Sequence, residues 1–305
     1  MNRSDPTSRI GRRQFLERLL TAGAGAAVGF ALPGALSGRP RTPAVSAAAA
    51  APPPPPGSPP DKQDLSGITV PPNDPAISAG AVQYPGVITP LMGYLSAPAG
   101  GETYPGVLVL HDVFGLTEHV QDVTRRLAKA GYVALAPDLA SRAGGTAKLG
   151  DLKKIGTALS QLSMAQFLQD LDTSLSHLGA HPLAAKTRLG ALGIGLGGAL
   201  AWVLLAQNSD LKAGSMLYGG IPQDQVLARL KGAALAIFAE GDRDTAKDIA
   251  DLDTAMKKAG LPWAYKIEPK VTRGFFDDTT NRYNAAAAKE TWQLTLDWYG
   301  KYLSA

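Results

Sequence analysis

A glycine-rich run in the middle of the chain has the spacing of a site that presents a catalytic nucleophile. The run Gly193-Ile194-Gly195-Leu196-Gly197-Gly198 follows a strand-like apolar segment and opens a segment of helical period. This is the placement of a nucleophile elbow, G-x-nucleophile-x-G, in which glycines allow a sharp turn and the next backbone N–H can stabilise an oxyanion. The central residue is Gly195, which has no side chain that can attack a substrate.

The same glycines fit the G-x-G-x-x-G spacing of a dinucleotide-binding loop. That loop normally belongs to the first strand–helix–strand unit, and an acidic residue follows about 20 positions later at the end of the next strand. Here at least two strand–helix pairs come first, and Asp210 precedes the next predicted strand. The chain also has no cysteine, and its four histidines are scattered (His111, His119, His177, His181). We therefore predict no cofactor and no metal.

Alternating strands and helices must position the elbow. Short runs rich in β-branched residues alternate with segments of helical period, which predicts an α/β domain with one doubly wound, mostly parallel sheet and helices on both faces. Strands are expected near 82–84, 91–95, 107–110, 132–136, 188–194, 216–218, 235–239 and 265–267, the first two as an antiparallel edge. Helices are expected near 120–130, 164–178, 196–207, 249–259 and 284–302.

Several motifs in one order give the chain a family resemblance. They are Leu110-His111-Asp112-Val113-Phe114-Gly115-Leu116, Gly131-Tyr132-Val133-Ala134-Leu135-Ala136-Pro137-Asp138-Leu139, the elbow, and Gly274-Phe275-Phe276-Asp277-Asp278-Thr279-Thr280-Asn281-Arg282-Tyr283. Together they resemble the dienelactone hydrolase family of the α/β-hydrolase superfamily, from about Val82 to Leu303. The resemblance implies an α/β-hydrolase fold and hydrolysis of carboxylic esters or lactones, as in a carboxymethylenebutenolidase.

The resemblance also implies a degenerate catalytic triad. The family's nucleophile falls on Gly195, its histidine on Arg273 and its acid on Asp242, which is retained. The acidic residue after the first core strand becomes Asp112, and the oxyanion donors would be the backbone N–H groups of Val113 and Leu196.

The order of the triad supports the same conclusion without the family. In these hydrolases the histidine follows the nucleophile and the acid along the chain, yet no histidine occurs after His181. Arginine cannot replace it, because a guanidinium stays protonated and cannot accept a proton. We expect Arg273 to form an ion pair with Asp242, and Gly195 to adopt the strained elbow conformation at little cost.

The N-terminal region has the pattern of an export signal. Gly11-Arg12-Arg13-Gln14-Phe15-Leu16 matches the core of a twin-arginine signal, and an apolar run follows from Leu19 to Leu36. We assign residues 1–47 to the signal, 48–64 to an Ala/Pro-rich linker and 65–305 to the α/β domain. Cleavage after Ala47 would release a periplasmic or extracellular protein, whereas an uncleaved run could serve as a membrane anchor.

The charge distribution argues against a nucleic-acid partner. The net charge is +4, but residues 1–47 hold seven arginines against two acidic residues, which leaves 23 basic and 24 acidic residues beyond. A nearly neutral body lacks the basic character that nucleic-acid binding requires.

Three functions are compatible with these residues. The leading hypothesis is an exported, non-hydrolytic family member, a pseudoenzyme that keeps the fold to bind an ester- or lactone-like ligand or a partner. The first alternative is an esterase or lactonase with a non-standard site, in which Asp112, Asp242 and Asp244 supply acid or base and water attacks. The second is an accessory subunit that an uncleaved leader holds to a membrane complex.

Overall fold

Eight strands form one mixed sheet in the computed structural model, which describes residues 69–242 and 246–304. Their order across the sheet is β1-β2-β4-β3-β5-β6-β7-β8. The strands are β1 (Ile77–Tyr84), β2 (Leu91–Pro98), β3 (Tyr104–Leu110), β4 (Val133–Pro137), β5 (Ala184–Ile194), β6 (Leu211–Leu217), β7 (Ala233–Ala239) and β8 (Trp263–Glu268). β1 and β2 pair antiparallel, as does β2 with β4, and the remaining pairs are parallel.

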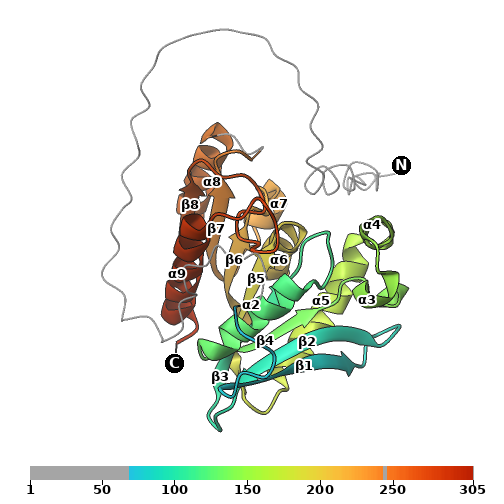
Figure 1. Cartoon of the computed structure of the whole chain (residues 1–305). Helices are drawn as coiled ribbons and strands as arrows, with labels where there is room; N and C mark the ends of the chain where they lie inside the picture. The colour runs from blue at the N-terminus through green and yellow to red at the C-terminus, as the bar shows by residue number, and fades with distance from the viewer. Residues whose placement is uncertain (1–68, 243–245, 305) are drawn as a thin grey trace, which may run out of the picture.

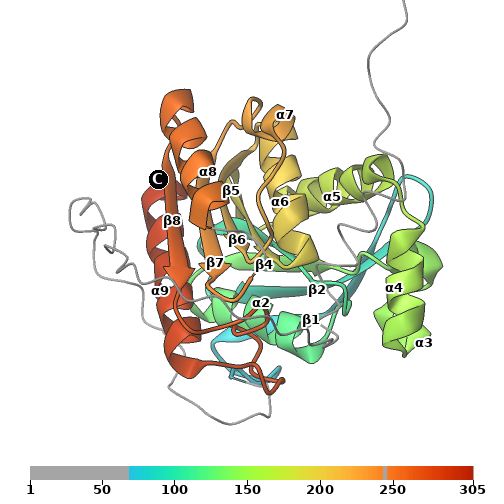
Figure 2. The ribbon, with the colours of Figure 1, turned by 90° about the horizontal axis from the view of Figure 1, so that it is seen from above.

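Helices cover both faces of this sheet (Figures 1 and 2). The longer ones are α2 (Glu118–Lys129), α5 (Met164–Gly179), α6 (Leu196–Gln207), α8 (Ala246–Ala259) and α9 (Ala285–Tyr302). The apolar side chains of α5, α6 and α8 pack into one hydrophobic cluster, and those of α2 and α9 pack into another on the opposite face. Because helices cover both faces, the internal strands β4 and β7 are buried along their whole length. The structure confirms the predicted α/β-hydrolase fold.

The segment between β4 and α5 differs from the prediction. It contains three short helices that the sequence analysis did not identify, η1 (Ser141–Ala143), α3 (Thr146–Leu149) and α4 (Leu152–Ser160). Gly144 and Gly150 end the first two in left-handed conformations, so no apolar stripe is long enough to be recognised. A further short helix, α7 (Asp224–Leu227), lies between β6 and β7.

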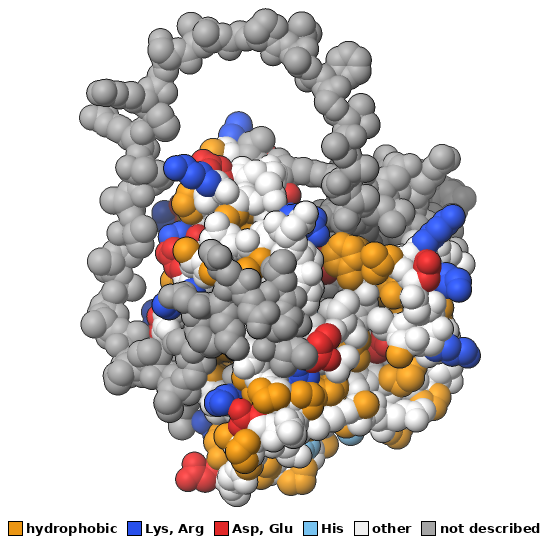
Figure 3. All heavy atoms as spheres, in the orientation of Figure 1, with side chains coloured by type: hydrophobic (Ala, Val, Ile, Leu, Met, Phe, Trp, Pro, Cys, Tyr) orange, Lys and Arg blue, Asp and Glu red, His pale blue; other side chains and the backbone are white. Residues whose placement is uncertain are grey.

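The predicted signal and linker, residues 1–64, lie outside the described residues. Among the helices that the structure does describe, none has the length and apolar character needed to cross a bilayer. On the face shown in Figure 3, basic and acidic side chains are interspersed.

Candidate functional site

The elbow joins β5 directly to α6. Gly195 has φ 55° and ψ −113°, a backbone conformation that glycine adopts far more easily than other residues, and its N–H donates to the carbonyl of Leu217 at 3.0 Å. A Cβ at Gly197 would lie 2.0 Å from the carbonyl oxygen of Leu110 on β3, so the close approach of helix and strand requires glycine there. The glycine run thus builds the sharp strand-to-helix turn of a nucleophile elbow.

Asp112 lies beside this elbow because it follows β3, which pairs with β5. Its Oδ1 accepts hydrogen bonds from the backbone N–H of Val113 at 2.8 Å and of Leu196 at 2.9 Å. These are the two N–H groups that the sequence analysis assigned to an oxyanion hole. The structure places them together, and both donate to the carboxylate of Asp112.

The Asp112 carboxylate also fills the space that a side chain at position 195 would occupy. A Cβ built on Gly195 would lie 2.2 Å from Cγ of Asp112 and 2.3 and 2.4 Å from its two oxygens. Non-bonded carbon atoms pack at about 3.5–4.0 Å, so a larger residue at 195 and Asp112 in this position exclude each other. Sequence reasoning singled out both residues but did not predict that one occupies the other's place.

Asp242 and Arg273 form the ion pair that the sequence analysis predicted. The Arg273 guanidinium donates to Asp242 Oδ2 from Nη2 at 2.8 Å and from Nε at 3.2 Å, and Nη2 also reaches Oδ1 at 3.2 Å. Only 5% of the Asp242 side chain and 17% of the Arg273 side chain are exposed. Asp242 is therefore bound by a guanidinium, which stays protonated and cannot accept a proton. Asp244, a further candidate from the sequence, lies outside the described residues.

The protein around Asp112 sets its electrostatics. Burial raises the pKa of its carboxyl group, while the N–H groups of Leu196 and Val113 and the charge of Arg273 act in the opposite direction. Burial likewise raises the pKa of Tyr218 far above its ordinary value. His111, next to Asp112, is fully buried: its Nδ1–H donates to the Asp112 carbonyl at 2.6 Å and its Nε2 accepts from Leu139 N–H at 3.0 Å. His111 is thus fully hydrogen-bonded within the fold.

A small pocket opens over the elbow. Its polar lining comes from Asp112, Thr117, His119, Tyr218, Asp277 and Arg282. His119 stands on the first turn of α2, and Arg282 lies in the loop before α9. The pocket therefore brings Asp112 together with a histidine that sequence reasoning had not placed near it.

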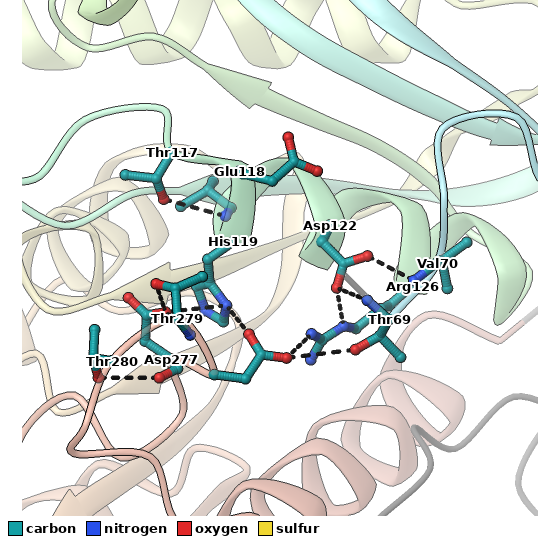
Figure 4. A network of polar contacts seen from close by, with 12 residues as sticks. Thr69, Val70, Thr117, Glu118, His119, Asp122, Arg126, Asp277, Thr279 and Thr280 are labelled. Carbon is teal, nitrogen blue, oxygen red and sulfur yellow. Dashed lines mark hydrogen bonds and ion pairs between the residues drawn. The ribbon is translucent and has the colours of Figure 1, made fainter. Parts of the chain in front are cut away.

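His119 is held by a chain of buried charges, shown in Figure 4. Its Nδ1–H donates to Oδ1 of Asp278 at 2.9 Å, and Oδ2 of Asp278 accepts from Arg126 at 2.5 Å. Burial alone would raise the pKa of Asp278, but the hydrogen bond from His119 and the charge of Arg126 outweigh it and lower the pKa to about 2. Nε2 of His119 is buried and has no hydrogen-bond partner within the described part of the chain. No sequence signal links His119 to Asp278, because 159 positions separate them.

The same residues could be considered as ligands for a cation. His119, Asp277 and Asp278 bring one nitrogen and two carboxylate oxygens within 4.8 Å of one another. However, Asp278 is already bound by Arg126 and by the Nδ1–H of His119. A cation would have to displace that proton beside a guanidinium, so the arrangement fits a histidine–carboxylate–arginine chain better than a metal centre.

Comparisons with known proteins identify a family that shares this fold. A family model described as the dienelactone hydrolase family matches residues 91–303. The chain is 32% identical over 238 residues to a "Putative carboxymethylenebutenolidase" of Methylorubrum extorquens, covering 73% of this chain and 81% of the relative. It is 28% identical over 256 residues to a protein of the same name in Escherichia coli K12, covering 80% and 94%.

Solved structures show the same fold. The "Putative Dienelactone Hydrolase" of Klebsiella pneumoniae superposes with a TM-score of 0.68 at 28% identity, over 74% of this chain and all of that one. A "Dienelactone Hydrolase-like Promiscuous" phosphotriesterase, P91, from metagenomic libraries gives a TM-score of 0.61 at 21% identity, a likeness of fold alone, over 75% of this chain and all of that one.

Proposed function

Because this chain belongs to the dienelactone hydrolase family, we propose that it is an exported member without conventional hydrolase activity, whose pocket binds a small ester- or lactone-like ligand. The observation that carries this proposal is the position of Asp112, whose carboxylate fills the space of the nucleophile and accepts both oxyanion donors.

Three parts of the hydrolytic reaction are missing together. Gly195 supplies no attacking atom, and Arg273 supplies no base for the Asp242 carboxylate to orient. The N–H groups of Val113 and Leu196 are already bonded to a carboxylate oxygen. Loss of one oxyanion donor alone typically costs about 10²–10³ in rate, so a substrate carbonyl that cannot reach these donors is poorly activated.

Hydrolysis of p-nitrophenyl acetate and γ-valerolactone by the purified protein tests the first half of the proposal. We expect no turnover above the protein-free rate, in the wild type and in Asp242→Ala alike. Turnover by the wild type that disappears in Asp242→Ala would show a working site and contradict the proposal.

Binding tests the second half. We expect γ-valerolactone to shift the backbone amide resonances of Val113, Leu196 and Gly115, whose N–H groups donate to Asp112 or which line the pocket. Unchanged resonances at millimolar ligand would count against a pocket for this ligand class.

The export proposal rests on the paired arginines Arg12 and Arg13 and the apolar run behind them. Replacing both arginines by lysine should retain the protein in the cytoplasm, while replacing Arg39 and Arg41 should not. The mass of the exported chain decides the fate of the leader. Loss of residues 1–47 supports a released protein, and an intact leader supports a membrane-anchored accessory subunit.

A further inference from the structure

The carboxylate of Asp112 stands where a hydrolase of this fold carries its nucleophile. Oδ1 is fixed by two N–H groups, whereas Oδ2 accepts no hydrogen bond from any described residue and Asp112 lines the pocket. We propose that Asp112 is itself a nucleophile, directed at a saturated carbon that carries a leaving group, as in a short alkyl halide. This proposal rests on the pocket being the ligand site of the proposed function.

The choice of electrophile follows from carboxylate chemistry. Attack of a carboxylate on an ester would give an anhydride, which is less stable than the starting ester, whereas attack on a saturated carbon gives an ordinary ester. Carboxylates of Asp and Glu serve as nucleophiles in other enzymes through such covalent intermediates. The two N–H groups fix the orientation of Asp112, which keeps Oδ2 available to the pocket without further rearrangement.

The first step, attack of the carboxylate on carbon, needs no proton donor. Oδ2 forms a bond to carbon as the carbon–halogen bond breaks, and the halogen leaves with the electron pair as halide. Arg282 lines the same pocket and makes no ion pair with any described residue, so its guanidinium is available to the departing anion. The product is an ester of Asp112 whose carbonyl oxygen is Oδ1.

Release of the product requires a base, and His119 has the arrangement for one. Its Nδ1–H donates to Asp278, so Nε2 carries the lone pair, and His119 lines the same pocket as Asp112. Water attacks Cγ of Asp112 while Nε2 takes its proton. The charge that develops on Oδ1 is stabilised by Val113 N–H and Leu196 N–H. The bond from Cγ to the alkoxy oxygen then breaks, and the alcohol takes the proton from His119. The resulting carboxylic acid releases the second proton of the water to solvent, which restores the carboxylate with one oxygen from water.

The absence of cysteine makes the covalent step simple to test, because no thiol competes for an alkylating agent. Bromoacetamide and 1-bromopropane are small, uncharged probes for the full chain. Incubation in ¹⁸O-labelled water over several turnovers should release bromide and place ¹⁸O in the Asp112 carboxyl group, as peptide mass spectrometry would show. This measurement uses the wild type, so it does not depend on the folding of a variant.

Variants then separate the role of Asp112 as nucleophile from the role of His119 as base. In Asp112→Asn, bromide release should fall to the protein-free rate. In His119→Gln, the alkyl ester should accumulate on Asp112 with one equivalent of bromide. In Asp210→Asn, which changes an exposed aspartate outside the pocket, the label should still appear on Asp112. Circular dichroism establishes that each variant is folded.

The outcomes are distinct. No bromide release and no label on Asp112 with either probe would overturn the proposal. If the protein also fails to hydrolyse esters, the proposed function would still stand. An adduct that persists in the wild type would support Asp112 as the nucleophile and overturn the assignment of His119. Turnover of esters that depends on Asp242 would overturn the proposed function instead.

Discussion

Asp112 and Gly195 must be considered as a pair, because the carboxylate of one occupies the side-chain position of the other. The sequence shows that Gly195 has no side chain that can attack, and the family resemblance implies that Asp112 stands at the family's acidic position. It could not show where the carboxylate lies, since that depends on how β3 and β5 align and on which N–H groups are within reach. The Asp242–Arg273 ion pair was predictable. The resemblance places these residues at the acid and histidine positions of the triad, which contact each other, and their charges are opposite.

The first prediction concerns this pair. Gly195→Ser should destabilise the protein by about 3 kcal/mol, because the new Cβ meets the Asp112 carboxylate and the positive φ is strained. In an Asp112→Gly background the same change should cost at least about 1 kcal/mol less, since only the strain remains. Urea denaturation of the wild type, the two single variants and the double variant measures the coupling between the two sites. If the losses in free energy of unfolding are additive, the two side-chain positions do not overlap.

The second prediction concerns Asp278. Its pKa is lowered to about 2, so the ionised form stabilises the folded state above its ordinary pKa of 3.8, and this contribution disappears as the pH falls through about 2. Asp278→Asn should lower the free energy of unfolding by about 3 kcal/mol at pH 7, because it leaves the buried Arg126 with fewer partners. The difference from the wild type should narrow by about 2 kcal/mol as the pH is lowered from about 4 toward 2. A difference that stays constant over this range would argue against an ionised, paired Asp278.

At the scale of elements, the alternation of strands and helices was predictable because its signals are local. Apolar runs marked β3, β4 and β7, and the 3.6-residue stripe marked α5. The helix α3 was not predictable, because it has four residues and no side-chain cap, whereas α4 begins at a capping residue, Asp151, that the sequence analysis missed. The pocket could not be predicted from the sequence either, because it joins distant segments: α2 supplies His119, and the loop before α9 supplies Asp277 and Arg282.

The third prediction concerns the contact of β8 with α9. Glu268, at the end of β8, is 1% exposed, and its pKa is raised to about 7 by burial and by the neighbouring Glu290. The folded state therefore holds a proton that the unfolded chain releases near pH 4.5, so this group lowers the stability as the pH rises from about 4.5 to about 7. Glu268→Gln should remove that loss and stabilise the protein by about 3 kcal/mol at pH 8.

Thermal unfolding of both proteins across this pH range provides the measurement. Glu290→Gln, which changes the exposed neighbour, is the matched control. It should give only part of the stabilisation at pH 8 that Glu268→Gln gives. Equal pH dependence in the wild type and Glu268→Gln would contradict the raised pKa.

At the scale of the whole molecule, the described body begins with a buried attachment. The Asp122 carboxylate accepts the N–H groups of Thr69 and Val70 at 3.0 and 2.7 Å, and Arg125 donates to the Val70 carbonyl at 2.5 Å. Composition predicted a boundary near residue 65, because a proline-rich spacer cannot build a core. It could not predict that charged residues of α2 hold the start of the domain.

The fourth prediction follows from this attachment. A chain that begins at residue 65 should unfold at the temperature of a chain that begins at residue 48, because the spacer adds no core. A chain that begins at residue 76 loses the bonds to Asp122 and Arg125 and should be less stable by about 3 kcal/mol. Differential scanning calorimetry of the three chains tests this; equal stability of the shortest chain would show that residues 69–75 lie outside the cooperative unit.

We propose that the Asp112 carboxylate obstructs an elbow whose backbone turn and two N–H donors are in place. The burst of p-nitrophenol from p-nitrophenyl acetate tests this in two designed proteins, Gly195→Ser with Arg273→His, and the same pair with Asp112→Gly. We predict that the double variant shows no burst, because the carboxylate still occupies the oxyanion donors and crowds the serine. The triple variant, in which both donors are released, should show an acyl-enzyme burst. An equal burst in the double variant would contradict the claim, since it would mean that Asp112 does not obstruct the site.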